Sequence, residues 1–186
     1  MVHLPLSRTI KSTVTNWKAR NHLLSLLARE QWLFSPTRIN MILTETKEWE
    51  AYYLPISVNG LRVLDVGAGE GETARFFLQH GASEIVCIEQ DKPSWEILKR
   101  NAEHHPLTCL NKRFDLKDLE IPHDFMKIDI EGYEELLLQV RLKKPSVIEV
   151  HGLQLRDKFQ SQGYAIEYPF KSEISPVCYA YLKKPQ

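Results

Sequence analysis

The feature that most constrains the fold is a regular alternation of short apolar runs and amphipathic segments after residue 60. Runs such as VLDV and IVCIE are apolar at almost consecutive positions, as expected of strands that helices cover on both faces. Strands are expected at 61–66, 84–89, 107–114, 124–130, 145–151, 164–170 and 176–184. Helices are expected between them at 72–81, 92–105, 132–142 and 153–163. This alternation predicts a doubly wound α/β fold with a largely parallel sheet.

The segment before residue 60 has the character of two helices instead. Large apolar side chains recur at helical spacing in the run 16–34. A second helix is expected to begin with Ser35 as its N-cap and Pro36 at its first position. We therefore divide the chain into an N-terminal helical extension, residues 1–59, and an α/β domain, residues 60–186.

Composition places the 186-residue chain among ordinary globular proteins, with 43% hydrophobic and 26% charged residues. Lys and Arg (24) balance Asp and Glu (24), so the whole chain does not carry the charge that a polyanionic partner would attract. Residues 1–40 are the exception, with six basic residues against one acid, a local charge of +5. The three cysteines form no metal or disulfide pattern and no apolar run could span a membrane, so we expect a cytoplasmic protein.

The sequence VLDVGAGEGE, residues 63–72, joins a buried strand to alternating glycines at the expected start of a helix. Such a loop lets the backbone approach a ligand closely. Glu89 ends the next strand, 22 positions after Gly67, where a carboxylate can accept from both ribose hydroxyls of an adenosine-like ligand. Phosphate is disfavoured, because the last glycine of a GxGxxG pattern is replaced by Glu72 and two further acids lie nearby. S-adenosylmethionine, which carries sulfonium and ammonium charges and no phosphate, fits this loop better than NAD or FAD.

Four ordered motifs resemble those of class I S-adenosylmethionine-dependent methyltransferases. VLDVGAGEGETA and CIEQD are similar to the first two motifs of that class, and FMKIDIEGYE and VIEVHG are similar to signatures of its FkbM-type members. The resemblance runs from about Gly60 to the C-terminus. It implies a Rossmann-like, mostly parallel seven-stranded sheet with an antiparallel C-terminal strand, in which residues 60–186 bind S-adenosylmethionine. The extension, residues 1–59, lies outside the family core and is expected to cap the domain or shape its acceptor side.

The resemblance also implies cofactor contacts residue by residue. The methionine part would be lined by Asp65, Gly67, Ala68, Gly69 and Gly71. Glu89 would bind the ribose, with Gln90 beside the adenine. Asp115, after the third strand, would contact the adenine amino group.

Catalytic residues are expected where the fourth and fifth strands end. The resemblance implies that Asp129 faces the methyl donor and acceptor, and Glu131 follows it at a backbone turn. Glu149 and His151 share one face of the fifth strand, because alternate strand residues point the same way. His151 or Asp129 would take the proton from an acceptor hydroxyl.

A divalent metal is an alternative use of these residues. Its ligands would come from Asp129, Glu131, Glu149 and His151. Their spacing does not require a metal, and we expect none. Glu134 and Glu135 are expected to be solvated, and no role is assigned to Lys127.

The residues together predict an enzyme that methylates a hydroxyl of a small molecule or sugar. No NPPY or DPPY string follows the fourth strand and no cysteine lies in a motif, which disfavours methylation of base amino groups or of pyrimidine C5. Three alternatives stay open. They are an RNA methyltransferase that uses the basic N-terminal segment with Trp17 and Trp32, an NAD-dependent oxidoreductase, and a cofactor-binding module without activity.

Overall fold

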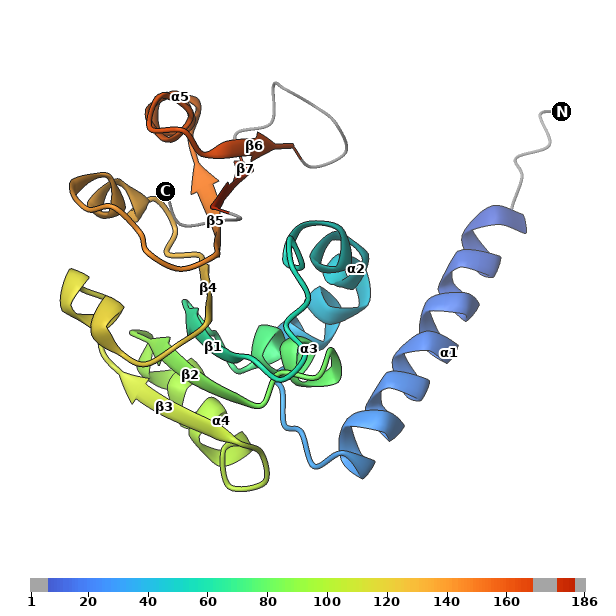
Figure 1. Ribbon diagram of the computed structural model, residues 1–186. Helices are drawn as coiled ribbons and strands as arrows, with labels where there is room; N and C mark the ends of the chain where they lie inside the picture. The colour runs from blue at the N-terminus through green and yellow to red at the C-terminus, as the bar shows by residue number, and fades with distance from the viewer. Residues whose placement is uncertain (1–6, 169–176, 183–186) are drawn as a thin grey trace, which may run out of the picture.

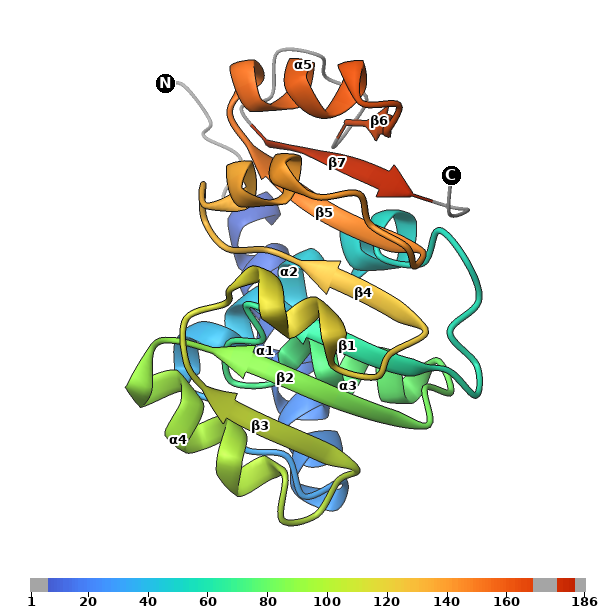
Figure 2. The same ribbon diagram turned by 60° about the vertical axis from the view of Figure 1, so that its left-hand side comes forward.

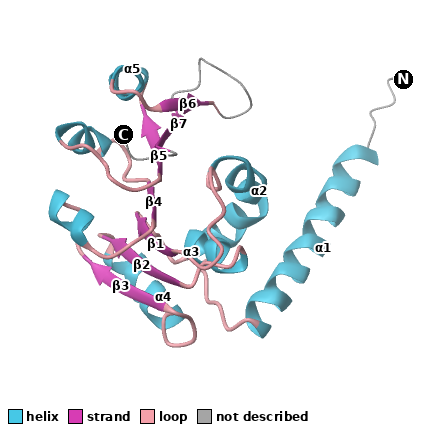
Figure 3. Cartoon of the chain, in the orientation of Figure 1, coloured by secondary structure: helices cyan, strands magenta, loops and turns pink. Residues whose placement is uncertain are grey.

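A computed structural model describes residues 7–168 and 177–182 of the chain. Its strands form one central sheet with helices on both sides (Figures 1 and 3). The strands are β1 (Arg62–Val66), β2 (Glu84–Glu89), β3 (Leu107–Asn111), β4 (Phe125–Ile128), β5 (Ser146–His151), β6 (Ala165–Glu167) and β7 (Val177–Leu182). All seven belong to a single sheet, as the sequence predicts.

The strand order is β3-β2-β1-β4-β5-β7-β6, which Figure 2 shows from one face. Strands β1 to β5 are parallel, whereas β7 pairs antiparallel with both β5 and β6. The order reverses direction at β1, since β2 lies on one side of it and β4 on the other. In an open sheet of this kind, ligands bind beyond the carboxyl ends of the strands at that switch point. The structure confirms the doubly wound fold and its antiparallel C-terminal strand.

The helices divide between the two faces of the sheet. They are α1 (Ser7–Arg29), α2 (Pro36–Tyr52), α3 (Glu72–Gln79), α4 (Lys92–Asn101), η1 (Leu116–Glu120), η2 (Glu134–Gln139) and α5 (Leu153–Ser161), where η marks a 3-10 helix. Side chains of α1 to α4 form one hydrophobic core with the sheet, and those of η1, η2 and α5 form the other. No helix in the described part of the chain is both long and apolar enough to cross a membrane.

Each buried strand contributes alternate residues to the two cores. In β1, Val63 packs on the α1–α4 side, whereas Leu64 packs on the opposite side. In β4, Phe125 and Met126 divide in the same way. This explains why the strands are apolar at consecutive positions rather than at alternate ones.

The N-terminal extension belongs to the first of these cores. Helix α2 begins as expected, with the Ser35 side chain accepting from the Arg38 N–H and Pro36 in the first turn. Leu27 of α1 and Trp49 of α2 are buried in the same cluster as strand residues. Trp17 is 62% exposed, whereas Leu23, further along α1, is buried.

Two expected elements differ in the structure. The helix expected at 132–142 is the shorter 3-10 helix η2, because Glu131 and Gly132 have left-handed φ values of 54° and 93° and turn the chain. The segment after β3, expected to be a loop, folds into η1. Parts of the last two expected strands, 164–170 and 176–184, lie outside the described residues.

Two glycines of the loop after β1 are required by close packing. A Cβ on Gly67, whose φ is 74°, would lie 1.7 Å from the carbonyl oxygen of Asp129. A Cβ on Gly71 would lie 2.9 Å from Leu98 and 3.2 Å from Trp32. The alternating glycines therefore let this loop pack tightly between the end of β4 and helix α4.

We predict that Gly67→Ala destabilises the fold by at least about 2 kcal/mol, through overpacking and a left-handed backbone. Gly60→Ala is the matched control, because Gly60 has a φ of 75° and no atom within 4 Å of its would-be Cβ. The free energy of unfolding of both variants is measured with denaturant. The loss in Gly60→Ala gives the cost of the left-handed backbone, and the additional loss in Gly67→Ala gives the cost of the clash. Equal losses would contradict the close approach of Gly67 to Asp129.

Candidate active site

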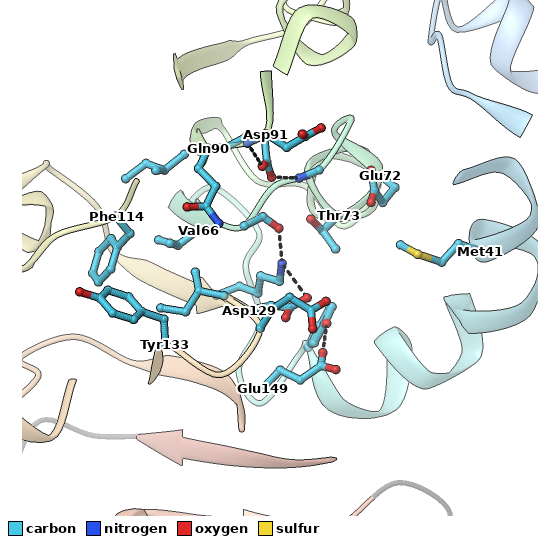
Figure 4. Close-up of a pocket in the computed structure, with 18 of the residues that line it drawn as sticks. Met41, Val66, Glu72, Thr73, Gln90, Asp91, Phe114, Asp129, Tyr133 and Glu149 are labelled. Atoms are coloured by element: carbon cyan, nitrogen blue, oxygen red, sulfur yellow. Dashed lines mark hydrogen bonds and ion pairs between the residues drawn. The ribbon is translucent and has the colours of Figure 1, made fainter. Parts of the chain in front are cut away.

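A cavity of about 900 Å³ opens at the carboxyl ends of the parallel strands (Figure 4). The loop after β1 and the ends of β2, β4 and β5 line one side, and helix α2 lines another. Its volume suits a cofactor-sized ligand. This is the position that the topology favours for a binding site.

The structure brings only some of the predicted residues to this cavity. Those that line it are Gly67, Gly69, Glu89, Gln90, Asp129 and Glu131. Those that do not line it are Asp65, Ala68, Gly71, Asp115 and His151. Two residues of the second group contact the lining: Asp65 accepts from the Thr73 hydroxyl, and His151 lies near Glu131 and Glu149.

Glu89 joins the end of β2 to the glycine loop. Its Oε2 accepts from the Gly69 N–H at 2.8 Å, and its Oε1 accepts from the Asp91 N–H at 2.6 Å. The side chain is largely buried yet lines the cavity. The carboxylate is thereby held at the cavity by backbone N–H groups of the two loops.

Beneath the loop lies a buried charge pair that the sequence interpretation missed. Lys127 is 1% exposed, and its Nζ donates to the Gly67 carbonyl at 2.9 Å. The same Nζ lies 3.3 Å from Asp65 Oδ1 and 3.7 Å from Asp129 Oδ2. Asp65 also accepts from the Thr73 hydroxyl at 2.6 Å.

Burial would lower the pKa of Lys127, but the surrounding carboxylates, Asp65 foremost, raise it above its usual value. The ammonium is therefore charged and links the glycine loop to the end of β4. The sequence contains a signal for it, because a lysine inside an otherwise apolar strand needs a charged partner.

The three acids of the glycine loop have different roles. Glu70 does not line the cavity; its Oε2 accepts from the Ser35 N–H at 2.6 Å and so fixes the start of α2. Glu72 does line it, pairing with Arg38 at 2.9 Å and accepting from the Glu70 N–H at 2.9 Å. Burial raises the pKa of Glu72 to about 7 against the opposing charge of Arg38. Of these acids Glu72 faces the cavity, whereas Glu70 serves the packing of the loop against the start of α2.

Asp115 caps η1 instead of lining the cavity. Its carboxylate accepts from the Lys117 N–H at 2.7 Å, and Asp118 completes the capping box by accepting from the Asp115 N–H. The neighbouring Phe114 lines the cavity, and Figure 4 shows it beside Tyr133 and near Gln90. We call the part of the cavity lined by Phe114 and Tyr133 the aromatic end. It was not predicted, because the spacing of residues in the sequence does not distinguish Phe114 from other apolar residues.

The predicted catalytic residues gather at the ends of β4 and β5. His151 Nε2 lies 3.6 Å from Glu131 Oε2 and 3.9 Å from Glu149 Oε1. Glu149 Oε2 accepts from the buried Tyr53 hydroxyl at 2.6 Å. Asp129 lies beside Glu149 in the cavity (Figure 4).

Glu134 corrects one expectation. It is 0% exposed rather than solvated, because the turn at Gly132 points it inward. Its Oε1 lies 3.0 Å from His151 Nδ1 and accepts from the Gly132 N–H at 2.9 Å. Its neighbour Glu135 is exposed, as expected, and pairs with Lys158. No periodicity distinguishes the two acids in the sequence.

The carboxylates around His151 shift its protonation. The hydrogen bond to Glu134, opposed by burial, raises the pKa of His151 to about 9, with further contributions from Asp129 and Glu149. Burial and the charge of Asp129 raise the pKa of Glu149 to about 7, against its bond from Tyr53. At neutral pH in the free protein, His151 is therefore protonated and Glu149 is close to half ionised.

Helix α2 supplies the opposite wall and adds more carboxylates. Glu45 and Glu48 line the cavity, and Glu48 Oε1 accepts from the Tyr179 hydroxyl at 3.3 Å. Across the whole lining there are eight carboxylates and four basic side chains. The acids are Glu45, Glu48, Glu72, Glu89, Asp91, Asp129, Glu131 and Glu149, and the bases are Arg38, Lys112, Arg113 and Lys127. The cavity thus favours a ligand with net positive charge.

We predict that Glu134→Gln lowers the pKa of His151 from about 9 toward its usual 6.5, because the variant removes the charge that stabilises the imidazolium. The folded pKa lies above the unfolded one, so protonated His151 stabilises the fold fully below about pH 6.5 and ceases to do so as pH rises through about 9. NMR titration of the imidazole checks the shift. The exposed Glu135→Gln is the control, and an unchanged His151 pKa in Glu134→Gln would refute the pairing.

Several solved structures share this fold at low sequence identity. An S-adenosylmethionine-dependent methyltransferase from Mesorhizobium loti matches with a TM-score of 0.53 and 14% identity, over 75% of this chain and 98% of that one. A candidate RNA methyltransferase from Pyrococcus horikoshii matches with a TM-score of 0.52 and 17% identity, over 74% of this chain and 81% of that one. A ribosomal protein L11 methylase from Lactobacillus delbrueckii matches with a TM-score of 0.51 and 15% identity, over 77% of each chain.

Neither a protein-family model nor a curated protein sequence matches the chain. The structural likeness therefore shows the architecture alone. The chain has the Rossmann-like fold of the class I S-adenosylmethionine-dependent methyltransferases.

Proposed function

We propose that the protein is an S-adenosylmethionine-dependent methyltransferase of the FkbM type that methylates a hydroxyl of a small molecule or sugar. The observation that carries the proposal is the placement of Glu89. Its carboxylate binds the Gly69 N–H at 2.8 Å and lines a cavity at the sheet's switch point. A ribose is the ligand group that such a carboxylate best satisfies.

The charge of the cavity supports S-adenosylmethionine over a dinucleotide. Eight carboxylates against four basic side chains leave the lining net negative. S-adenosylmethionine carries a sulfonium, an ammonium and one carboxylate, for a net charge of about +1, whereas a pyrophosphate would meet like charge in a partly desolvated site. This argues against the NAD-dependent alternative.

We place the adenosine between the aromatic end and Glu89. Ile88, Gln90 and Phe114 border that end, where an adenine ring can pack against apolar and aromatic side chains. The methionine part then extends along Gly67 toward Arg38, the basic side chain paired with Glu72. Asp65 and Asp115 lie outside the lining. We therefore propose that Asp65 stabilises the glycine loop and that Asp115 caps η1.

The proposed reaction is a direct displacement. The acceptor oxygen forms a bond to the methyl carbon as the carbon–sulfur bond breaks, and the electron pair stays on sulfur to give neutral S-adenosylhomocysteine. The hydroxyl proton passes to a carboxylate at the ends of β4 and β5. Glu149, with a pKa of about 7, suits this task better than His151, which is already protonated at neutral pH in the free protein. Asp129 lines the same part of the cavity.

The extension, residues 1–59, is proposed to form the acceptor side. Helix α2 lines the cavity through Arg38, Met41, Glu45, Glu48 and Trp49. A shortened chain that lacks residues 1–59 would lose this wall. The extension is thus a part of the binding site rather than an independent unit.

An RNA acceptor is a second candidate, and two observations favour it. Residues 1–40 carry a charge of +5, and one solved structure of the same fold is a candidate RNA methyltransferase. Against it, the acidic cavity repels a phosphate backbone, so RNA would have to present a single extruded nucleotide.

We predict that Glu89→Gln weakens S-adenosylmethionine binding by about tenfold to a hundredfold, because a charged hydrogen-bond acceptor contributes roughly 1.5–3 kcal/mol. Glu84→Gln, at the exposed opposite end of β2, is the matched control. Titration calorimetry with S-adenosylmethionine, and separately with NAD, provides the measurement. Tight NAD binding without S-adenosylmethionine binding would overturn the proposal.

The acceptor class is tested by incubating the protein with S-adenosylmethionine labelled in its methyl group and a fractionated cell extract. We expect label in the small-molecule fraction. Label in RNA, together with an RNA mobility shift that weakens steeply with salt, would establish the RNA alternative instead. Cofactor binding without transfer to any fraction would indicate a binding module.

A further inference from the structure

Three potential metal ligands converge at the ends of β4 and β5. One ligand atom each from Asp129, Glu149 and His151 lies within 4.8 Å of the others. The pairing of β4 with β5 accounts for this, because Ile128 lies opposite Ile148 and the next residues of the two strands therefore adjoin. The group combines an imidazole with two carboxylates, so it is more than an acidic patch.

A second set of side chains orients these ligands. The fully buried Glu134 accepts from or pairs with His151 Nδ1 at 3.0 Å. His151 Nε2 then faces Glu149 Oε1 at 3.9 Å and the exposed Glu131 Oε2 at 3.6 Å. The buried Tyr53 hydroxyl binds Glu149 Oε2 at 2.6 Å and leaves Oε1 on the histidine side. A carboxylate on the far nitrogen of a histidine is the usual support of a metal-bound imidazole.

Asp129 has one carboxylate oxygen without a hydrogen-bond partner. Its Oδ2 lies 3.7 Å from Lys127 Nζ, whereas Oδ1 is buried and has no hydrogen-bond partner among the described residues. An unsatisfied buried carboxylate oxygen is costly, and a cation bound by the Asp129 carboxylate would offset that cost.

We propose that Asp129, Glu149 and His151 form a binding site for a divalent first-row metal ion such as Mn²⁺ or Zn²⁺. An imidazole with two carboxylates is a donor set that such ions accept. Asp129 and Glu149 line the cavity, so an ion held by them would be accessible to a molecule bound there. With an ion bound, Glu149 and His151 would be ligands, and Glu149 would no longer be the proton acceptor assigned to it in the free protein. The role of the ion, coordination of the acceptor oxygen next to the methyl group, rests on the proposed function, but the binding of the ion does not.

The test is calorimetric titration of the full chain with Mn²⁺, Zn²⁺ and Mg²⁺, with a folding check by circular dichroism. We expect one ion per chain, bound more tightly for Mn²⁺ or Zn²⁺ than for Mg²⁺. Glu149→Gln and His151→Gln should weaken binding by at least about a hundredfold, and Glu134→Gln by about 10–100-fold, as loss of a supporting carboxylate does.

Glu48→Gln is the matched control, because Glu48 is an acid of the same cavity that lies outside the ligand group. It should change metal affinity by less than about threefold. An equal loss in Glu48→Gln would show a diffuse acidic surface and overturn the site, and so would no Mn²⁺ or Zn²⁺ binding at millimolar concentration. A tight site unaffected by Glu149→Gln or His151→Gln would overturn it too.

Titration with S-adenosylmethionine, with and without EDTA, separates this inference from the proposed function. Cofactor binding without any metal binding would refute the metal site alone. Metal binding at these residues without cofactor binding would refute the methyltransferase proposal alone.

Discussion

The cavity depends on one buried ammonium. Lys127 binds the Gly67 carbonyl and lies near the carboxylates of Asp65 and Asp129, so a single side chain holds the glycine loop of β1 to the end of β4. Its burial would be costly without those partners. Because Gly67 also packs directly on the Asp129 backbone, the loop and the neighbouring strand end form one rigid floor for the ligand.

The acidic residues of the site, which the sequence does not distinguish, have different roles in the structure. Glu89 fixes the loop to β2, Glu70 fixes it to the start of α2, and Glu72 faces the cavity. Glu134 holds the Nδ1 side of the His151 ring. Some of the acidic residues therefore hold the fold together, whereas others line the cavity. Only the acids that line the cavity bear on the charge of the ligand.

The sequence predicted the architecture well, because strand burial and the alternation of elements leave a direct trace in residue order. It also predicted that Glu89, Gly67 and Asp129 lie together at the strand ends, where the structure shows them lining the cavity. It missed the burial of Glu134, which depends on a left-handed turn at Glu131 and Gly132. It could not locate the α2 wall, since the contact of Arg38 with Glu72 joins residues far apart in the chain and leaves no periodic signal.

The anchoring of Ser35 by Glu70 has a mechanical consequence. The same short connector is held at Leu33, whose N–H and carbonyl both bond to the Asn101 side chain, and Asn101 also donates to the Glu70 carbonyl. The glycine loop and the first turn of α2 are thus joined by one network of hydrogen bonds. The loop therefore also sets the position of the wall across the cavity, so the two sides of the cavity form one unit.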